Sequence, residues 1–147
     1  MTAVQTGLEP GMSVIERRFQ VTRPQLVRYA LAAGDGNAIH LDDAAAQAVG
    51  LPGVVAHGML TMAFAIEAVA DWVGGSDLVV SCSVRFARPL PVPEGADGAE
   101  LTVQGRVAEL LEGGRIRVAL SVSSAGRAIL GRAEAVVRHA PGAVDEP

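Results

Sequence analysis

The feature that most constrains the fold is residues 57–73, which are apolar at nearly every position. Thr61, Glu67 and Asp71 interrupt the run, so a helix here would present apolar side chains on almost every side. Such a helix must be enclosed by protein, because water would otherwise contact apolar surface around its circumference. The run is also shorter than the roughly 20 residues that a membrane span requires. We therefore predict a central helix with the rest of the chain packed around it, and no membrane association.

Strand-like runs fill the second half of the chain, separated by short turns that contain glycine and by one proline-rich loop. These runs cover roughly residues 78–88, 100–111, 115–124 and 127–138. Apolar and polar residues alternate along them, as in a sheet with one buried face. Small residues on one face of the last run, Gly131, Ala133 and Ala135, would let a helix approach closely. The pattern predicts an α+β fold in which an antiparallel sheet wraps around the helix.

The first half predicts one strand and two helices. Alternation over residues 14–21 is typical of a half-buried strand. Thr22 and Gln25 then have the spacing of a capping box, which predicts a helix over about residues 23–33. A second, short helix is expected from Asp42 to Val49, with acidic residues at its positive end. Between the two helices, glycines and Asn37 predict a loop.

Length and composition limit the possible functions. The 147 residues suit a single domain, for which we expect the bounds 10–140, with flexible ends at 1–9 and 141–147. A net charge of -4 argues against a nucleic-acid partner, and the absence of lysine excludes Schiff-base chemistry. One cysteine, Cys82, forms no internal disulfide, and the N-terminal residues lack the pattern of a signal peptide. We expect a cytoplasmic protein.

Two short motifs have the chemistry of an active site. Asp35 and His40 flank Asn37 in a six-residue turn, where a carboxylate and an imidazole could act together as general acid and base. The alternative is that both residues only stabilise the turn. Further on, Gly58 begins the apolar helix, and its free N–H could hold a developing oxyanion. The alternative there is that glycine allows close packing and His57 satisfies the helix start.

Taken together, the motifs support a family resemblance. Residues 34–42, Gly-Asp-Gly-Asn-Ala-Ile-His-Leu-Asp, are similar to the D-x-N-P-x-H signature of the MaoC-like and (R)-specific enoyl hydratase family, and residues 55–60 follow at the family's spacing. Residues 83–93 resemble the strand and loop beside that family's site. The resemblance covers about residues 10–138, and its one departure is Ala38, where the family commonly has proline. Within the family, the chain looks most like the catalytic subunit of mycobacterial-type (3R)-hydroxyacyl-ACP dehydratases.

The resemblance implies a hot-dog fold and a hydro-lyase in fatty-acid metabolism. It implies that the enzyme reversibly hydrates trans-2-enoyl thioesters, or dehydrates (3R)-hydroxyacyl thioesters, carried on CoA or acyl carrier protein. It assigns catalysis to Asp35 and His40 and the oxyanion hole to Gly58. The residues expected to support the site or bind substrate are Asn37, His57, Met59 and Phe86. No cofactor or metal is expected.

Alternatives and partners complete the hypothesis. The competing functions are those of an acyl thioesterase and of a non-catalytic, acyl-binding subunit of a heterodimeric dehydratase. A lone hot-dog domain should expose a sheet edge, so we expect a homodimer or a heterodimer with a related subunit. If an acidic carrier protein delivers the substrate, Arg85, Arg88 or Arg127 are candidates to receive it; the alternative is that they are ordinary solvated arginines.

Overall fold

A computed structural model gives the structure of the protein and describes residues 7–139. The flexible ends expected at 1–9 and 141–147 therefore lie outside the described residues, apart from 7–9. In chain order the elements are β1 (Ser13–Val21), α1 (Arg23–Ala33), η1 (Ala38–His40), α2 (Asp43–Ala48), α3 (Gly58–Val73), η2 (Ser76–Leu78), β2 (Val79–Phe86), β3 (Ala99–Leu111), β4 (Arg115–Ser124) and β5 (Arg127–Arg138). Every predicted helix and strand is present, with bounds close to those expected.

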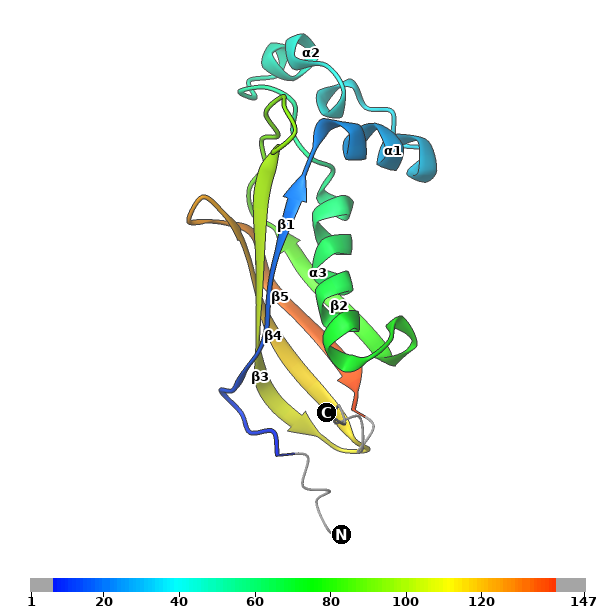
Figure 1. Ribbon diagram of the computed structural model, residues 1–147, viewed down its shortest axis with the longest axis vertical. Helices are drawn as coiled ribbons and strands as arrows, with labels where there is room; N and C mark the ends of the chain where they lie inside the picture. Colours follow the sequence, from blue (N-terminus) through cyan, green and yellow to red (C-terminus); the bar gives the residue numbers. More distant parts are fainter. Residues whose placement is uncertain (1–6, 140–147) are drawn as a thin grey trace.

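The strands form one antiparallel sheet in the order β1-β3-β4-β5-β2. The sheet curves along α3, which lies against its concave face, while α1 and α2 sit together beyond one end of the sheet (Figure 1). This arrangement is the hot-dog fold that the sequence predicted. Strands β1 and β2 are the two edges of the sheet, and α3 runs across its middle.

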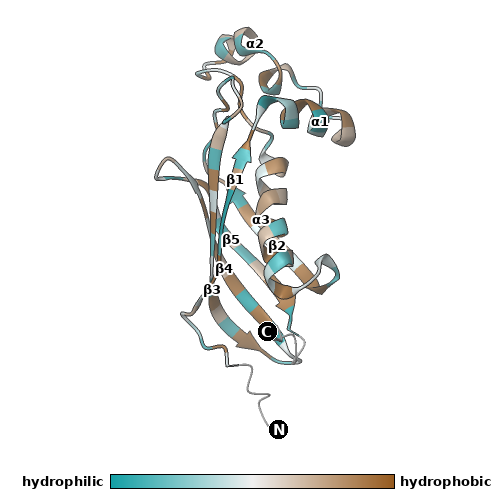
Figure 2. Cartoon of the chain, in the orientation of Figure 1, coloured by the Kyte–Doolittle hydropathy of each residue, from teal (hydrophilic) through white to brown (hydrophobic). Residues whose placement is uncertain are grey.

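The core lies between α3 and the sheet. Hydrophobic and hydrophilic residues alternate along the strands, as expected for a sheet with one buried face (Figure 2). In β3 and β4, for example, Leu101, Val103 and Val118 are fully buried between strands and helix. On the helix, Ala65 and Ala68 are buried, and their small side chains let α3 lie close to the sheet. Close packing of this kind fixes where α3 begins, and that position matters for the site described below.

The structure differs from expectation at α3. Its buried residues, such as Thr61, Ala65 and Val69, lie on one side, while Met59 and Ala63 are exposed and Met62 and Ile66 are only partly covered. The prediction that protein encloses the whole helix is therefore wrong for this chain alone. Strand β2 is also uncovered, since none of its residues is buried. Among the described helices, none is both long enough and apolar enough to cross a bilayer.

Candidate active site

The loop after α1 places Asp35 and His40. Gly34 ends α1 with a left-handed φ of 71°, and the Asp35 backbone N–H donates to the Ala30 carbonyl at 3.1 Å. The Asp35 carboxylate accepts from the Asn37 N–H at 3.2 Å, and the Asn37 side chain accepts from the Ile39 N–H at 3.3 Å. The second contact caps η1, a single turn of 3₁₀ helix within a segment for which the sequence predicts a loop. Asn37 thus holds the turn without proline at position 38.

His40 lies at the end of η1 with 9% of its surface exposed. Its Nδ1 is 2.7 Å from the Val55 carbonyl oxygen, and the Val55 N–H donates to the Ile39 carbonyl at 3.2 Å. Because a carbonyl oxygen only accepts, Nδ1 must have the proton. In neutral His40, Nε2 is therefore the unprotonated nitrogen, free to accept a proton.

His57 supports this arrangement from the residue before α3. It is 1% exposed, its Nε2 donates to the Asp35 carbonyl at 3.2 Å, and its ring stacks on His40 with centroids 3.8 Å apart. The ring of Tyr29 lies on it as well, at 4.7 Å. Burial lowers the pKa of the His57 imidazole, and the adjacent His40 lowers it further, so the ring is neutral at pH 7. Its Nδ1 is buried without a hydrogen-bond partner among the described residues.

The Asp35 side chain is exposed at the mouth of the site. Asp35, His40 and His57 each offer an atom, and these three atoms lie within 4.8 Å of one another. Within the described residues no hydrogen bond joins the Asp35 carboxylate directly to the His40 ring, so one water could bridge them.

The start of α3 supplies the second part of the site. His57 makes no side-chain cap, and the Gly58 N–H has no partner among the described residues. Thr61 is buried, and its hydroxyl donates to the Gly58 carbonyl at 2.6 Å, which fixes the first turn. The Phe86 ring lies over Gly58, so closely that a Cβ built on this glycine would be 3.0 Å from it. The Gly58 amide is thus a fixed donor beneath an aromatic ring.

Two cavities reach the candidate site, one at Gly58 and one at His40. The first has a volume of about 300 Å³ and a mostly apolar wall that includes Ala56, Gly58, Thr61, Phe86, Arg88 and Ile129. The second, of about 500 Å³, is lined by residues that include Thr22, Arg23, His40, Leu41 and Glu94. Because His40 stacks on the residue that precedes Gly58, a bound molecule could contact both the imidazole and the amide.

An ion pair holds the elements around the second cavity. The Arg23 guanidinium donates to both oxygens of Asp43, at 2.9 and 3.2 Å, and its Nε donates to the Val92 carbonyl at 2.6 Å. The Val54 N–H also donates to Asp43. These hydrogen bonds lower the pKa of the Asp43 carboxyl, with Arg23 as the largest cause. The clamp joins α1, α2 and the segments on either side of the site.

The structure brings together most of the residues singled out from the sequence. Asp35, Asn37, His40, His57 and Gly58 form one cluster, and Phe86 covers its amide. Met59 lies beside them on α3 but is 55% exposed. Sequence reasoning missed four supporting residues, which are Arg23, Tyr29, Asp43 and Thr61. Only Thr61 had a local signal, since it lies one helical turn after Gly58.

Comparisons with known proteins identify a matching family and similar structures. A family model described as MaoC like domain matches residues 5–122. The 3-hydroxyacyl-thioester dehydratase X of Mycobacterium tuberculosis is 36% identical over 94 residues, 58% of this chain and 32% of that protein. A solved MaoC-like dehydratase has a TM-score of 0.86 at 33% identity, covering 90% of this chain and 41% of the other. The R-hydratase PhaJ1 of Pseudomonas aeruginosa has a TM-score of 0.78 at 28% identity, and the match covers 95% of this chain and 90% of that chain. The chain thus spans less than half of the first two relatives.

Proposed function

The chain belongs to the MaoC-like domain family, and on that premise we propose that it reversibly hydrates trans-2-enoyl thioesters, the reverse reaction being dehydration of (3R)-hydroxyacyl thioesters. One observation supports this most strongly. The Val55 carbonyl fixes the tautomer of His40, so Nε2 can accept a proton beside the Asp35 carboxylate, while the free Gly58 amide lies one residue from the stacked ring of His57.

The reaction follows from these positions. A water molecule held between Asp35 and His40 gives a proton to the pair as its oxygen bonds to C3 of the enoyl group. The electrons of the double bond move toward the thioester carbonyl, where the Gly58 N–H stabilises the enolate oxygen. The pair then returns one proton to C2, which restores its starting protonation state. Water is thereby divided as hydroxyl on C3 and hydrogen on C2.

His57 and Asn37 would position the reacting groups without touching the substrate. His57 ties its ring to the Asp35 backbone and stacks on His40, so it joins the two halves of the pair. A neutral His57 also adds no charge beside the imidazole that must accept a proton. Phe86 lines the cavity at Gly58 and would contact the bound thioester there, and the exposed Met59 would contact it from the first turn of α3.

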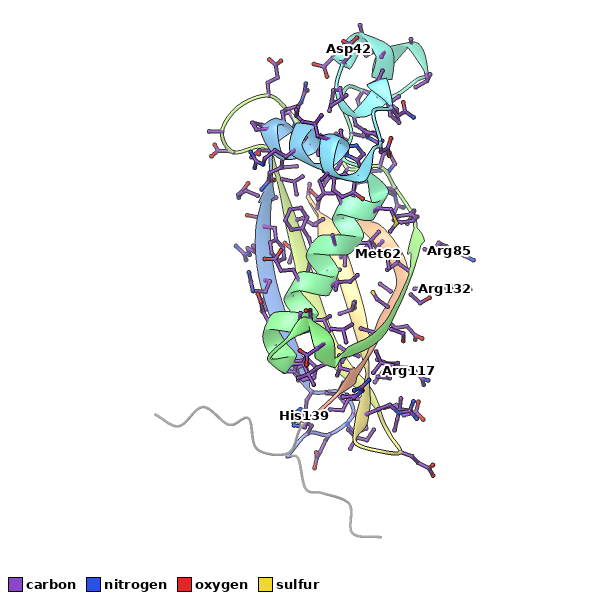
Figure 3. The ribbon with its side chains drawn as sticks, turned by 90° about the vertical axis from the view of Figure 1, so that its right-hand side faces the viewer. Asp42, Met62, Arg85, Arg117, Arg132 and His139 are labelled. Carbon is purple, nitrogen blue, oxygen red and sulfur yellow. The ribbon has the colours of Figure 1, made fainter. Side chains whose placement is uncertain are left out.

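The test is hydration of crotonyl-CoA by the purified chain, followed as loss of the enoyl-thioester absorbance and checked for a (3R) product. Asp35→Asn and His40→Ala should each lower kcat by at least about a hundredfold, the usual contribution of general acid–base catalysis. Matched controls are Asp97→Asn and His139→Ala, since Asp97 lies in an exposed loop and His139 just beyond β5, both outside the cluster. Figure 3 shows His139 at the opposite end of the sheet from α1 and α2.

Other outcomes separate the competing functions. Release of free CoA without a hydroxyacyl product would identify a thioesterase. A folded chain that is inactive alone but active with a related hot-dog domain would identify one half of a heterodimer. No hydratase activity either alone or with such a domain, or full activity in both the Asp35→Asn and His40→Ala variants, would refute the proposal.

We also propose that a second hot-dog domain covers the site. The Asp35 loop, Met59 and Phe86 are exposed in the single chain, whereas hydration chemistry needs a site that excludes bulk water.

Cys82 forms no disulfide, which suits the reducing cytoplasm in which we propose that the protein works.

A further inference from the structure

Four arginines gather where β2 and β5 meet beside the Gly58 cavity. The ladder pairs Arg85 with Gly131, the neighbour of Arg132, and the Arg88 N–H donates to the Ile129 carbonyl at 3.2 Å. The Arg88 guanidinium also reaches the Ala128 carbonyl, next to Arg127, at 3.2 Å. We call Arg85, Arg88, Arg127 and Arg132 the arginine rim. Figure 3 shows Arg85 and Arg132 near each other at the same edge of the sheet.

The rim is a local excess of positive charge on an acidic protein. No Asp or Glu occurs in residues 78–93 or 113–133, although the whole chain has a net charge of -4. Three of the eight other described arginines have carboxylate partners: Arg17 pairs with Asp71, Arg23 with Asp43, and Arg117 with Glu109. Among the described residues, the four rim arginines form no ion pair. Their charge is available to an anion from outside the chain.

The position of the rim relates this charge to the reaction. Arg88 lines the same cavity as Gly58 and Phe86, so the cavity runs from the proposed oxyanion donor to the rim. The wall of this cavity is mostly apolar, and Arg88 is the charged residue that lines it. A fatty-acyl tail would gain nothing by ending against unpaired arginines. A ligand arm that starts at the thioester and ends in an anionic group would match both the Gly58 amide and the arginines of the rim.

We propose that the arginine rim binds the phosphate at the far end of the pantetheine arm that holds the acyl group. This phosphate is common to CoA and to acyl carrier proteins, and guanidinium groups bind phosphate oxygens through paired hydrogen bonds. The arm then occupies the Gly58 cavity, and the acyl chain extends toward the His40 side. The proposal rests on the proposed hydration of acyl thioesters.

The test compares crotonyl thioesters of pantetheine, of 4′-phosphopantetheine and of CoA. The variants are Arg85→Gln, Arg127→Gln and their double variant, since neither arginine side chain makes a hydrogen bond or ion pair within residues 7–139. Arg106→Gln on β3 is the matched control, an exposed arginine far from the cavity. In the double variant the KM for both phosphorylated substrates should rise about tenfold, as loss of one or two exposed charge-assisted contacts implies. The KM for crotonyl-pantetheine should stay unchanged. Added salt should reduce the difference in KM between the wild type and the double variant for the phosphorylated substrates.

Each result separates the possible sources of the effect. A KM that rises for CoA but not for 4′-phosphopantetheine would overturn the proposal in favour of a nucleotide contact. A crotonyl-loaded acyl carrier protein is assayed as a fourth substrate, and a KM that rises for it alone would overturn the proposal in favour of docking to the acidic surface of the carrier protein. Equal rises with crotonyl-pantetheine, or none in any substrate, would also overturn it. If the wild type hydrates none of the thioesters, the hydratase proposal fails, and calorimetric binding of 4′-phosphopantetheine to the wild type and double variant still tests the rim.

Discussion

Gly58 lacks a side chain where one would crowd the Phe86 ring, and its backbone conformation does not itself require glycine. Its φ is not among the positive values found at ten other glycines, so alanine can adopt its conformation. A Cβ would nevertheless lie only 3.0 Å from the Phe86 ring, beside the amide proposed to stabilise the oxyanion. Gly58→Ala should therefore lower kcat by about tenfold or more. The free energy of unfolding should change by less than about 1 kcal/mol, because alanine reduces the entropy of the unfolded chain.

Activity and the free energy of unfolding should be measured on the same preparation. Gly131→Ala on β5 is the control, since Gly131 also has no positive φ and a Cβ there would make only ordinary contact, 3.7 Å from the Ala87 side chain. A Gly58→Ala protein of unchanged stability and unchanged kcat would contradict the oxyanion role.

His57 predicts a dependence of stability on pH. Its pKa is lowered in the folded state, whereas the unfolded state has the ordinary value of about 6.5. Below that value the unfolded chain binds more protons, so the contribution of neutral His57 is complete above about pH 6.5 and is lost as pH falls through the folded pKa. In His57→Phe the ring stack is kept and the titration is removed. Stability of this variant should fall less than that of the wild type between pH 7 and pH 5.

The same variant separates positioning from folding. His57→Phe loses the hydrogen bond to the Asp35 carbonyl, so kcat at pH 7 should fall about ten- to a hundredfold through misplacement of the Asp35 loop. KM should change little, because His57 does not contact the substrate in the proposed mechanism. Parallel stability curves for the two proteins would show that His57 does not titrate on unfolding.

At the scale of elements, local patterns predicted most of the fold. Alternation identified the strands, and the capping box placed α1, where the Gln25 side chain does accept from the Thr22 N–H at 2.9 Å. The 3₁₀ turn η1 was not predicted, because besides its Asn37 cap it depends on hydrogen bonds with Val55, which lies 15 residues after His40 along the chain. The motif residues of the site were predictable from sequence. Tyr29 was not, because its contact with His57 exists only after α1 packs near α3.

The clamp between Arg23 and Asp43 joins elements 20 residues apart, which is why no sequence period revealed it. Asp43→Asn should lower the thermal midpoint at pH 7 and leave the second cavity less ordered, since one side chain bonds both Arg23 and the Val54 N–H. Because the folded pKa is lowered, the carboxylate stabilises the protein above the unfolded value of about 3.9, and this is lost as pH falls through the folded pKa. The gap between wild type and variant should thus close in acid. A constant gap from pH 7 to pH 3 would contradict the ion pair, and Asp97→Asn again serves as the control.

At the scale of the whole molecule, the uncovered side of α3 and the edge strand β2 form one surface. Met59, Met62, Ala63 and Ile66 lie at helical spacing on the side of α3 away from the sheet, and β2 has no buried residue. In Figure 3 Met62 lies between α3 and the edge on which Arg85 stands. An apolar stripe beside an unpaired strand edge is a surface that proteins normally cover.

We predict that a second copy of this chain covers it, and that sedimentation velocity will show a dimer. Val80, 44% exposed on β2, would then lie in the interface, so Val80→Lys should shift the protein toward monomer and lower its activity together. Leu110→Lys is the matched control, because Leu110 is 47% exposed at the end of β3 and lies away from α3. A wild-type monomer that dimerises only with a related hot-dog domain would replace the homodimer by a heterodimer. A monomer fully active alone would show that the exposed Asp35 loop needs no cover, because the site would then exclude enough water by itself.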